Sequence, residues 1–219
     1  EVGRALARAY PVEAGRVIPV PESGGYAAHG DSQQSGVPFA EGRVKNADVG
    51  RTVMQPSQTH RQLGVRLKRN PLREVIEGQR LVVVDDSIVR GNTQRAIIRM
   101  LREAGASEVH VRISSPPVQW PCFYGIDFAT RDELIANGRS VEEIREHIGA
   151  DSLGYVSLEG LVAASEQPAE QLCRACFDGV YPVPLAAPER QGKHSLEAPT
   201  GLPSPALGQE LPLVLGGQA

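Results

Sequence analysis

Residues 79–93 read Gln79-Arg80-Leu81-Val82-Val83-Val84-Asp85-Asp86-Ser87-Ile88-Val89-Arg90-Gly91-Asn92-Thr93. The four successive apolar residues, three of them β-branched, predict a strand that is buried on both faces, as in a parallel sheet. After Gly91 the spacing becomes helical, with Gly105 as the C-cap and an apolar stripe made of Ala96, Ile97, Met100, Leu101 and Ala104. Residues 109–113 alternate as a following strand. A strand, a helix and a strand form a βαβ unit, so the sequence predicts an open α/β sheet.

Weaker patterns extend this unit in both directions. We expect helices at 1–10, 26–34, 59–69, 139–148 and 157–164, strands at 16–20 and 38–45, a turn at 21–25 and a loop at 46–57. We assign residues 1–150 to one domain and residues 151–185 to a helical, cysteine-containing extension of it. Residues 186–219 are rich in Pro, Gly, Ala and Ser without periodicity, which predicts a disordered tail.

Composition excludes several classes of protein. The 219 residues carry a formal charge of −3 and no sustained basic block, which argues against a nucleic-acid partner. The longest clean apolar run is Leu81–Val84, far short of the ~18 residues that cross a bilayer, and the first thirty residues hold no signal core. We therefore expect a cytoplasmic protein without a membrane partner.

The start of the chain suggests a longer protein. Because the chain starts at Glu1, has its first Met at Met54 and opens in an uncapped helical pattern, we expect it to be the C-terminal part of a longer chain. A trimmed chain is the alternative.

Asp85 and Asp86 stand where an open α/β sheet binds its ligand, beyond the carboxyl end of a strand. Backbone amides at the start of the next helix, with the hydroxyls of Ser87 and Thr93, suit a phosphate monoester. The two carboxylates suit a sugar diol or a hydrated Mg²⁺. The simpler alternative is that two acids after a strand only cap the next helix. The whole run from Val82 to Thr93 favours the ligand site.

This run resembles the phosphoribosyl pyrophosphate (PRPP) fingerprint of the type I phosphoribosyltransferases. Further matching segments occur in order: Lys45-Asn46, Val49-Gly50-Arg51-Thr52, Gln55-Pro56-Ser57-Gln58, Cys122-Phe123-Tyr124-Gly125-Ile126-Asp127 and Cys173-Arg174-Ala175-Cys176-Phe177-Asp178-Gly179-Val180-Tyr181-Pro182. Together they resemble the glutamine PRPP amidotransferases in their iron–sulfur-containing form, over about residues 16–185. The resemblance implies a type I phosphoribosyltransferase fold, with an open, mostly parallel sheet flanked by helices, and the first step of purine biosynthesis.

The resemblance also implies roles for individual residues. Asp85 and Asp86 would bind the ribose hydroxyls and Mg²⁺, with Ser23 a further position at the Mg²⁺. The 5′-phosphate would lie in the segment made of Ser87, Ile88, Val89, Arg90, Gly91, Asn92 and Thr93. Lys45 and the loop 46–58, including Arg51, would cover the pyrophosphate. The chain departs from the family at Ala47, in place of a frequent Arg, at Asp48, in place of Tyr, and at Asn92, in place of Thr. An acid at position 48 is expected to weaken PRPP binding or loop closure.

Three cysteines, Cys122, Cys173 and Cys176, are the only ones in the chain. An odd number argues against a disulfide framework, and Cys173-x-x-Cys176 by itself is compatible with zinc, redox chemistry or coincidence. The resemblance implies that all three bind a 4Fe–4S cluster of structural function. Such a cluster has four ligands, so the fourth is expected upstream of Glu1. None of the five histidines has metal or triad spacing.

The resemblance implies further properties of the enzyme as a whole. The family's glutaminase half starts with a nucleophilic cysteine that nothing here matches, so no catalytic nucleophile is predicted and this part would use ammonia rather than glutamine. Purine nucleotides are expected as feedback inhibitors and a homotetramer as the assembly.

Two other functions remain open at this stage. A purine, pyrimidine or orotate phosphoribosyltransferase would share Asp85 and Asp86 but would not explain the cysteine segments or residues 49–52. A non-catalytic module that senses PRPP or a nucleotide would keep the phosphate loop without turnover. Pyrophosphate release that depends on ammonia separates the amidotransferase from both.

Overall fold

The computed structural model describes residues 1–45, 69–124 and 130–183. Its centre is a four-stranded sheet in the order β1-β4-β5-β6, in which every neighbouring pair is parallel. The strands are β1 (Arg16–Pro19), β4 (Arg80–Asp85), β5 (Glu108–Ile113) and β6 (Ser152–Tyr155). The open parallel α/β sheet predicted from the sequence is therefore confirmed. The edge strand β6 was not predicted.

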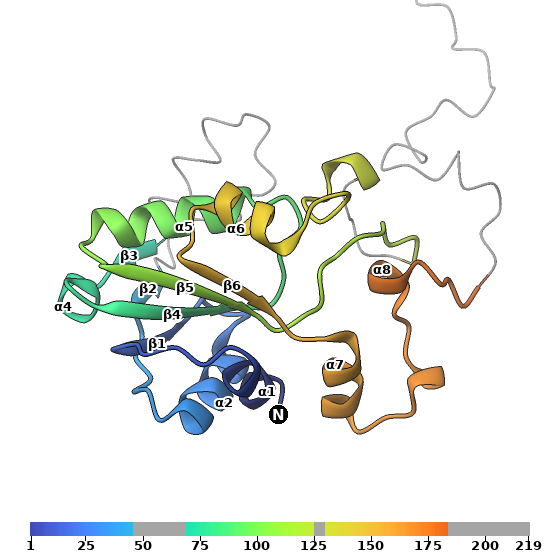
Figure 1. The fold of residues 1–219 in the computed structure, drawn as a ribbon, viewed down its shortest axis with the longest axis horizontal. Helices are drawn as coiled ribbons and strands as arrows, with labels where there is room; N and C mark the ends of the chain where they lie inside the picture. Colours follow the sequence, from blue (N-terminus) through green and yellow to red (C-terminus); the bar gives the residue numbers. More distant parts are fainter. Residues whose placement is uncertain (46–68, 125–129, 184–219) are drawn as a thin grey trace, which may run out of the picture.

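Helices cover both faces of this sheet (Figure 1). α1 (Val2–Ala9) and α2 (Gly25–Ser35) pack on one face, and α5 (Asn92–Glu103) and α6 (Val141–Ile148) pack on the other. α6 begins at a capping box in which Ser140 and Glu143 exchange hydrogen bonds, and it ends at Gly149, whose φ of 80° is the left-handed conformation that glycine tolerates best. The helices predicted at 1–10, 26–34 and 139–148 are confirmed.

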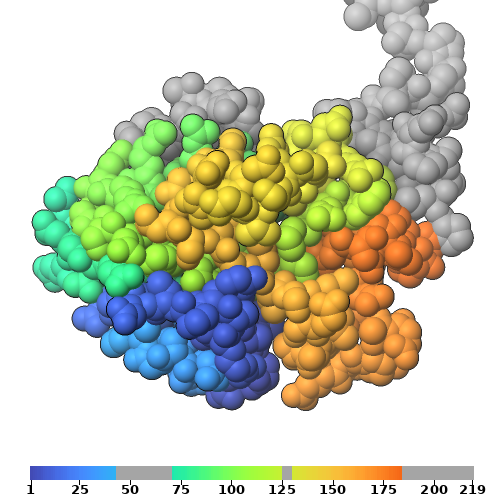
Figure 2. Space-filling model, viewed as in Figure 1, coloured from blue at the N-terminus to red at the C-terminus, as the bar shows by residue number. Residues whose placement is uncertain are grey.

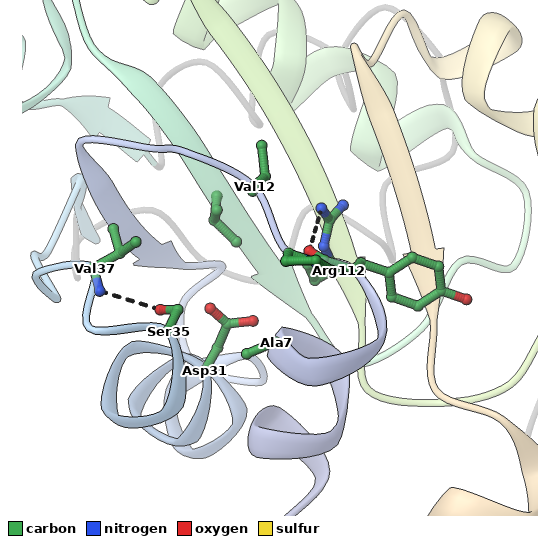
Figure 3. Close-up of a pocket in the computed structure, with 9 residues that line it drawn as sticks. Ala7, Val12, Asp31, Ser35, Val37 and Arg112 are labelled. Atoms are coloured by element: carbon green, nitrogen blue, oxygen red, sulfur yellow. Dashed lines mark hydrogen bonds between the residues drawn. The ribbon is translucent and has the colours of Figure 1, made fainter.

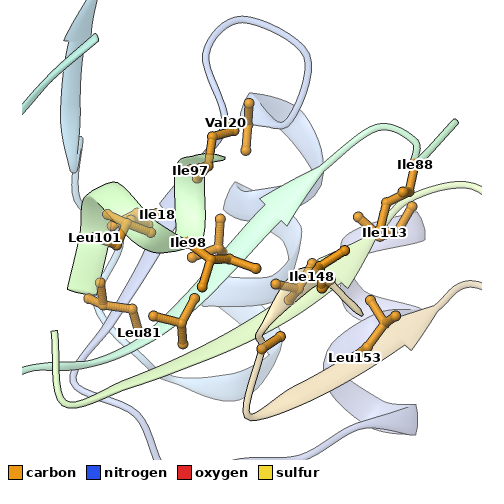
Figure 4. Packing of buried hydrophobic residues seen from close by; sticks show 14 of the residues in the cluster. Ile18, Val20, Leu81, Ile88, Ile97, Ile98, Leu101, Ile113, Ile148 and Leu153 are labelled. Atoms are coloured by element: carbon orange, nitrogen blue, oxygen red, sulfur yellow. The ribbon is translucent and has the colours of Figure 1, made fainter. Parts of the chain in front are cut away.

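The core is built from strands that are buried on both faces. Leu81 and Val83 belong to the larger cluster with α5 and α6, whereas Val82 and Val84 pack with Ala28 of α2. Figure 4 shows the larger cluster, in which Ile97, Ile98 and Leu101 of α5 meet Ile18, Leu81 and Ile113 of the strands. This two-sided burial explains why β4 reads as an unbroken apolar run in the sequence.

A small antiparallel hairpin stands apart from the main sheet. It pairs β2 (Arg43–Lys45) with β3 (Arg69–Pro71), and the short helix α4 (Arg73–Ile76) leads from it into β4. The strand predicted at 38–45 was too long, because only residues 43–45 form a strand and Phe39 makes a single bridge to Val17. The predicted loop at 46–57 and nearly all of the predicted helix at 59–69 lie outside the described residues.

After the sheet the chain continues through α7 (Leu158–Ser165), the 3₁₀ turn η3 (Ala169–Gln171) and α8 (Ala175–Asp178); a further 3₁₀ turn, η2 (Arg131–Glu133), precedes α6. α7 confirms the helix predicted at 157–164. In the space-filling view the orange segments from α7 to α8 project beside the α/β body (Figure 2). The predicted tail 186–219 lies outside the described residues. Among the described helices, none is both long enough and apolar enough to cross a membrane.

Candidate active site at the carboxyl ends of β1 and β4

Two loops meet where the neighbouring strands β1 and β4 end. The turn 21–25 follows β1 and the loop 86–91 follows β4, and the two strands are in register with Pro19 opposite Val84. The carboxyl ends of parallel strands therefore bring Ser23 and Asp85 together, although they are 62 residues apart in sequence.

Gly24 makes this approach sterically possible. Its amide donates to the Val20 carbonyl at 2.9 Å, and the Val20 amide donates to the Val84 carbonyl at 2.8 Å. A Cβ atom on Gly24 would lie 2.0 Å from the Val84 carbonyl oxygen, far inside contact distance. The turn therefore needs glycine at position 24 in order to lie against the end of β4.

Asp85 is the buried acid of the site, with 5% of its surface exposed. Its Oδ1 accepts hydrogen bonds from the Ser23 hydroxyl at 2.7 Å and from the Asp86 amide at 2.9 Å. Its Oδ2 accepts a hydrogen bond from Nε2 of Gln94. Burial raises the pKa of Asp85 from 3.8 to about 6, against the lowering effect of the Ser23 and Asp86 hydrogen bonds, and the neighbouring Asp86 carboxylate adds to the rise.

Asp86 is exposed beside it. Its Oδ1 accepts a hydrogen bond from the Ser87 amide at 2.7 Å and lies 3.4 Å from the Ser87 hydroxyl. The two acids thus differ in environment: Asp85 is buried and accepts three hydrogen bonds, whereas the Asp86 side chain is exposed to solvent.

The loop after Asp86 is fixed by contacts of Ile88 and Val89 with the rest of the chain. It leads into a helix without a side-chain cap. Ile88 is buried in the core, and the Val89 carbonyl accepts from the Ile135 amide at 2.8 Å. Gly91, the N-cap of α5, has a φ of 77°, and a Cβ there would lie 2.6 Å from Cδ1 of Ile135. Asn92 and Thr93 are exposed in the first turn of α5. The first amides of a helix lack intrahelical partners, so this end is suited to an anion.

Arg90 is paired within the protein rather than turned toward an open site. Its Nε and Nη2 donate to the two carboxylate oxygens of Glu133 in η2, at 3.2 and 3.4 Å. The hydrogen bond from Arg90 is the main cause that lowers the pKa of Glu133. Both side chains are close to half exposed, so this ion pair contributes little to stability.

Of the segment predicted to cover the pyrophosphate, Lys45 and the loop 46–58, the structure describes only Lys45. Lys45 ends β2 opposite Arg69 of β3. Arg51 and the rest of the loop 46–58 lie outside the described residues.

The three cysteines lie in one region away from the acids. Cys122 and Cys176 are half-buried and Cys173 is exposed. The amides of Gln119 and Trp120 both donate to the Cys176 carbonyl, at 3.0 and 3.1 Å, which ties the segment before Cys122 to α8. Burial raises the pKa of Cys176 to about 11, and negative charge on Cys122 and Cys173 adds to the rise.

Within the described residues the three cysteines are not grouped around a common metal position. In the part of the chain that the structure describes, no three His, Cys, Asp or Glu side chains are arranged to hold a metal ion. The cysteines are thus near enough to influence one another electrostatically without forming a cluster site in this conformation.

A small cavity lies on the face of the sheet that α1 and α2 cover, between these helices and the strands (Figure 3). Its volume is about 10 Å³, which is room for one water molecule. Asp31 and Arg112 face it, and each is only 3% exposed. Arg112 donates to the Tyr10 carbonyl at 3.0 Å. Burial raises the pKa of Asp31 to about 6, although Arg112 and Ser35 lower it. The cavity with its two buried charged side chains is too confined for a substrate.

The sequence did not identify three residues that shape the site: Gly24, Gln94 and Glu133. A signal existed for Gln94, because it lies three and four residues before Ile97 and Ile98 on the buried stripe of α5. A polar residue on an apolar stripe requires a buried partner. Gly24 and Glu133 act through contacts that no local pattern encodes.

Comparisons with known proteins agree with this geometry. The family model for the phosphoribosyl transferase domain matches residues 17–114. Amidophosphoribosyltransferases from Mycobacterium tuberculosis and Synechocystis are 65% and 53% identical, each over 90% of this chain. The aligned region is 38% of the mycobacterial protein and 40% of the cyanobacterial one, so the chain spans about two fifths of the length of these relatives.

Two solved structures are similar to this chain over most of its length. One is the glutamine PRPP amidotransferase from B. subtilis in complex with ADP and GMP, and the other is described as the allosteric regulatory enzyme of purine biosynthesis. Each superposes with a TM-score of 0.76 at 51% identity and covers 85% of this chain. The chain covers 42% and 41% of those two chains.

Proposed function

This chain belongs to the amidophosphoribosyltransferases, whose phosphoribosyltransferase part it matches, and on that premise we propose that it binds PRPP at the carboxyl ends of β1 and β4 and transfers its phosphoribosyl group to ammonia. The observation that carries the proposal is the pairing of a buried and an exposed acid, Asp85 and Asp86, with the uncapped start of α5. Acids suit ribose hydroxyls, and helix amides suit a phosphate.

The parts of PRPP are assigned by this chemistry. Asp86 and Asp85 accept hydrogen bonds from the ribose hydroxyls. The amides between Ser87 and Thr93 hold the 5′-phosphate, for which the Ser87 amide exchanges its bond to Asp86 for one to the ligand. Lys45 and Arg51 are proposed to face the pyrophosphate, as the resemblance implies, and Arg90 supports the loop through Glu133.

The reaction needs no protein nucleophile. The nitrogen lone pair of ammonia forms a bond to C1 of the ribose while the C1–O bond breaks. The electron pair of the C1–O bond leaves with pyrophosphate. A proton is then lost from the nitrogen, which gives 5-phosphoribosylamine with inversion at C1. Fixed acceptors around the ribose and fixed donors around the phosphate hold C1 in line for attack and exclude water from it.

Oxygen donors at the site fit a magnesium ion. The Asp86 carboxylate is exposed, and the Ser23 hydroxyl and Asp85 lie directly behind it. Mg²⁺ commonly takes one or two carboxylates and completes its shell with phosphate oxygens and water. When bound with PRPP it would neutralise charge on the leaving pyrophosphate.

The cysteine region fits an iron–sulfur cluster in the chemistry of its donors. Cys122, Cys173 and Cys176 influence one another's charge, and Cys176 holds its proton to high pH because the thiolate is buried near other sulfurs. Bound iron reverses this balance by stabilising thiolates. A 4Fe–4S cluster has four ligands, so these three would need a fourth that is not a cysteine of this chain. The cluster would be structural.

The remaining proposals follow the relatives. The enzyme would use glutamine as the source of ammonia through a glutaminase domain beyond this chain. It would act in the first step of purine biosynthesis in the cytoplasm. The B. subtilis relative was solved with ADP and GMP, which supports purine nucleotides as feedback inhibitors here. A homotetramer is proposed on the resemblance, as are the boundaries at residues 150 and 185 and the disordered tail.

The test is pyrophosphate release from PRPP with Mg²⁺ and ammonium chloride, measured with and without glutamine. The control variant carries Asp85→Asn and Asp86→Asn. Ammonia-dependent release by the wild type and none by the folded variant supports the proposal. PRPP binding without release indicates a sensing module, release that requires a base indicates another phosphoribosyltransferase, and an active variant contradicts the site.

The cluster has a separate test. Replacing Cys173 and Cys176 by Ser is expected to remove the brown absorbance of anaerobically reconstituted protein and to leave PRPP binding detectable. An unchanged iron spectrum in the double variant would contradict the ligand assignment.

A further inference from the structure

We propose that Gln94 is a positioning residue for PRPP, which acts by fixing the Asp85 carboxylate from the side opposite Ser23. The inference rests on the proposed function, because its consequence is the affinity of the site for the ribose of PRPP. Gln94 does not touch the proposed ligand. It acts through Asp85.

The geometry shows how the carboxylate is held. Ser23 and the Asp86 amide donate to Oδ1, and Gln94 donates to Oδ2. Donors therefore hold both oxygens, and rotation of the carboxylate would break bonds on both sides. Without Gln94, Oδ2 would face a buried region in which it has no other donor among the described residues. The carboxylate would then turn, and the Ser23 hydroxyl and Asp86 amide would lose their common acceptor.

Gln94 stands at an unusual place for such a bond. It is the third residue of α5, where a Gln side chain often turns back to the N-cap amide of its own helix. Here it reaches across to the end of β4 instead. The bond therefore ties the start of α5, where the phosphate is proposed to bind, to the acid that is proposed to bind the ribose. It fixes the spacing between these two parts of the site.

Packing alone does not account for a Gln at this position. The side chain is 2% exposed, and its Oε1 has no hydrogen-bond partner in the described residues. An unpartnered buried acceptor is unfavourable, and a Met or Leu would fill the same space on the apolar stripe without that cost. What the amide supplies, and an apolar residue lacks, is the donor to Asp85.

The test compares three variants of the full chain. Gln94→Met keeps the length of the side chain and removes the donor, and Gln94→Ala is a second variant in case Met packs badly. Ile98→Met is the matched control, because it alters another buried residue of α5, whose hydrocarbon side chain has no hydrogen bond to donate. Binding of PRPP with Mg²⁺ is measured by titration calorimetry, and the folded fraction by denaturant unfolding.

The expected result is a loss of PRPP affinity of roughly 10- to 100-fold in Gln94→Met, the scale of one hydrogen bond to a charged group. Ile98→Met is expected to stay within about twofold of the wild type, a change below the scale of that hydrogen bond. Two further ligands, which differ only in their ribose hydroxyls, separate a positioning role of Gln94 from a general disturbance of the fold. The wild type is expected to bind ribose 5-phosphate more tightly than its 2,3-dideoxy counterpart, and Gln94→Met is expected to lose this preference.

Each other outcome decides against the inference. A Gln94→Met variant that binds PRPP like the wild type overturns it and leaves the proposed function standing. Equal weakening of both sugar phosphates, or equal weakening in Ile98→Met, shows a structural role only. A folded wild type that does not bind PRPP refutes the proposed function, and the inference is lost with it.

Discussion

Asp85→Asn is expected to stabilise the fold at neutral pH while it impairs the site. Burial raises the pKa of Asp85 from 3.8 to about 6, so the ionised carboxylate is disfavoured in the folded state. At 1.36 kcal/mol per pKa unit this rise corresponds to about 3 kcal/mol as an upper limit. Asn keeps the shape and still accepts from Ser23 and Asp86. If the Gln94 amide turns over, its Oε1 gains the Asn side chain as a donor.

The sign of the pH dependence follows from the raised pKa. Well below the unfolded pKa of 3.8 the carboxyl is protonated in both the folded and the unfolded chain, so its ionisation has no cost. As the pH rises through 6, the folded wild type loses this stability, because the unfolded carboxyl ionises more easily. The variant has nothing to titrate at this position. Its advantage over the wild type should therefore grow with pH, to about 1–3 kcal/mol by pH 7.5.

The measurement is urea unfolding of both chains between pH 4 and 8 in metal-free buffer. The other buried acid with a raised pKa, Asp31, is present in both chains and cancels in the difference. A difference that stays constant with pH, or a variant that becomes relatively less stable as the pH rises, would refute the argument from burial.

Two further predictions concern packing around the site and beneath the sheet. Gly24→Ala should cost about 1–3 kcal/mol in unfolding free energy, because its Cβ would collide with a carbonyl of β4, and PRPP affinity should fall with it; an unchanged urea midpoint contradicts the close approach. Arg112→Met should cost about 1–3 kcal/mol, because the Tyr10 carbonyl loses its buried donor and Asp31 loses a nearby positive charge. Adding Asp31→Asn should recover part of that loss, and a double variant no more stable than Arg112→Met shows that the two charges are not coupled.

The sequence predicted the centre of the fold because there the local pattern and the tertiary environment agree. β4 is apolar along its length since it is buried on both faces, and α5 carries a clear stripe. β6 was missed because Ser152-Leu153-Gly154-Tyr155 is short, carries a glycine and shows too little alternation to stand out. Its glycine is required by packing instead: a Cβ on Gly154 would lie 2.5 Å from the Tyr10 ring of a segment far away in sequence.

The site was predictable to the same extent. Asp85 and Asp86 follow a strand of obvious character, so their place at the carboxyl end of the sheet could be inferred. The difference in environment between the two acids could not be inferred from the sequence. Burial separates the two acids, and it depends on the turn at Gly24 and on the start of α5, which reach β4 only in the folded chain.

The buried acid itself argues that this region serves a ligand. The ionised form of Asp85 is less favourable in the folded chain than in water, because burial raises its pKa. Three donors are nevertheless aligned on its two oxygens: the Ser23 hydroxyl, the Asp86 amide and the Gln94 side chain. An apolar residue at position 85, with apolar neighbours in place of Ser23 and Gln94, would fill the same space without the cost of burying a charge. A carboxylate kept in place by three donors at the end of a strand is pre-organised for a partner outside the chain, and the ribose hydroxyls of PRPP are the donors that this arrangement is suited to receive.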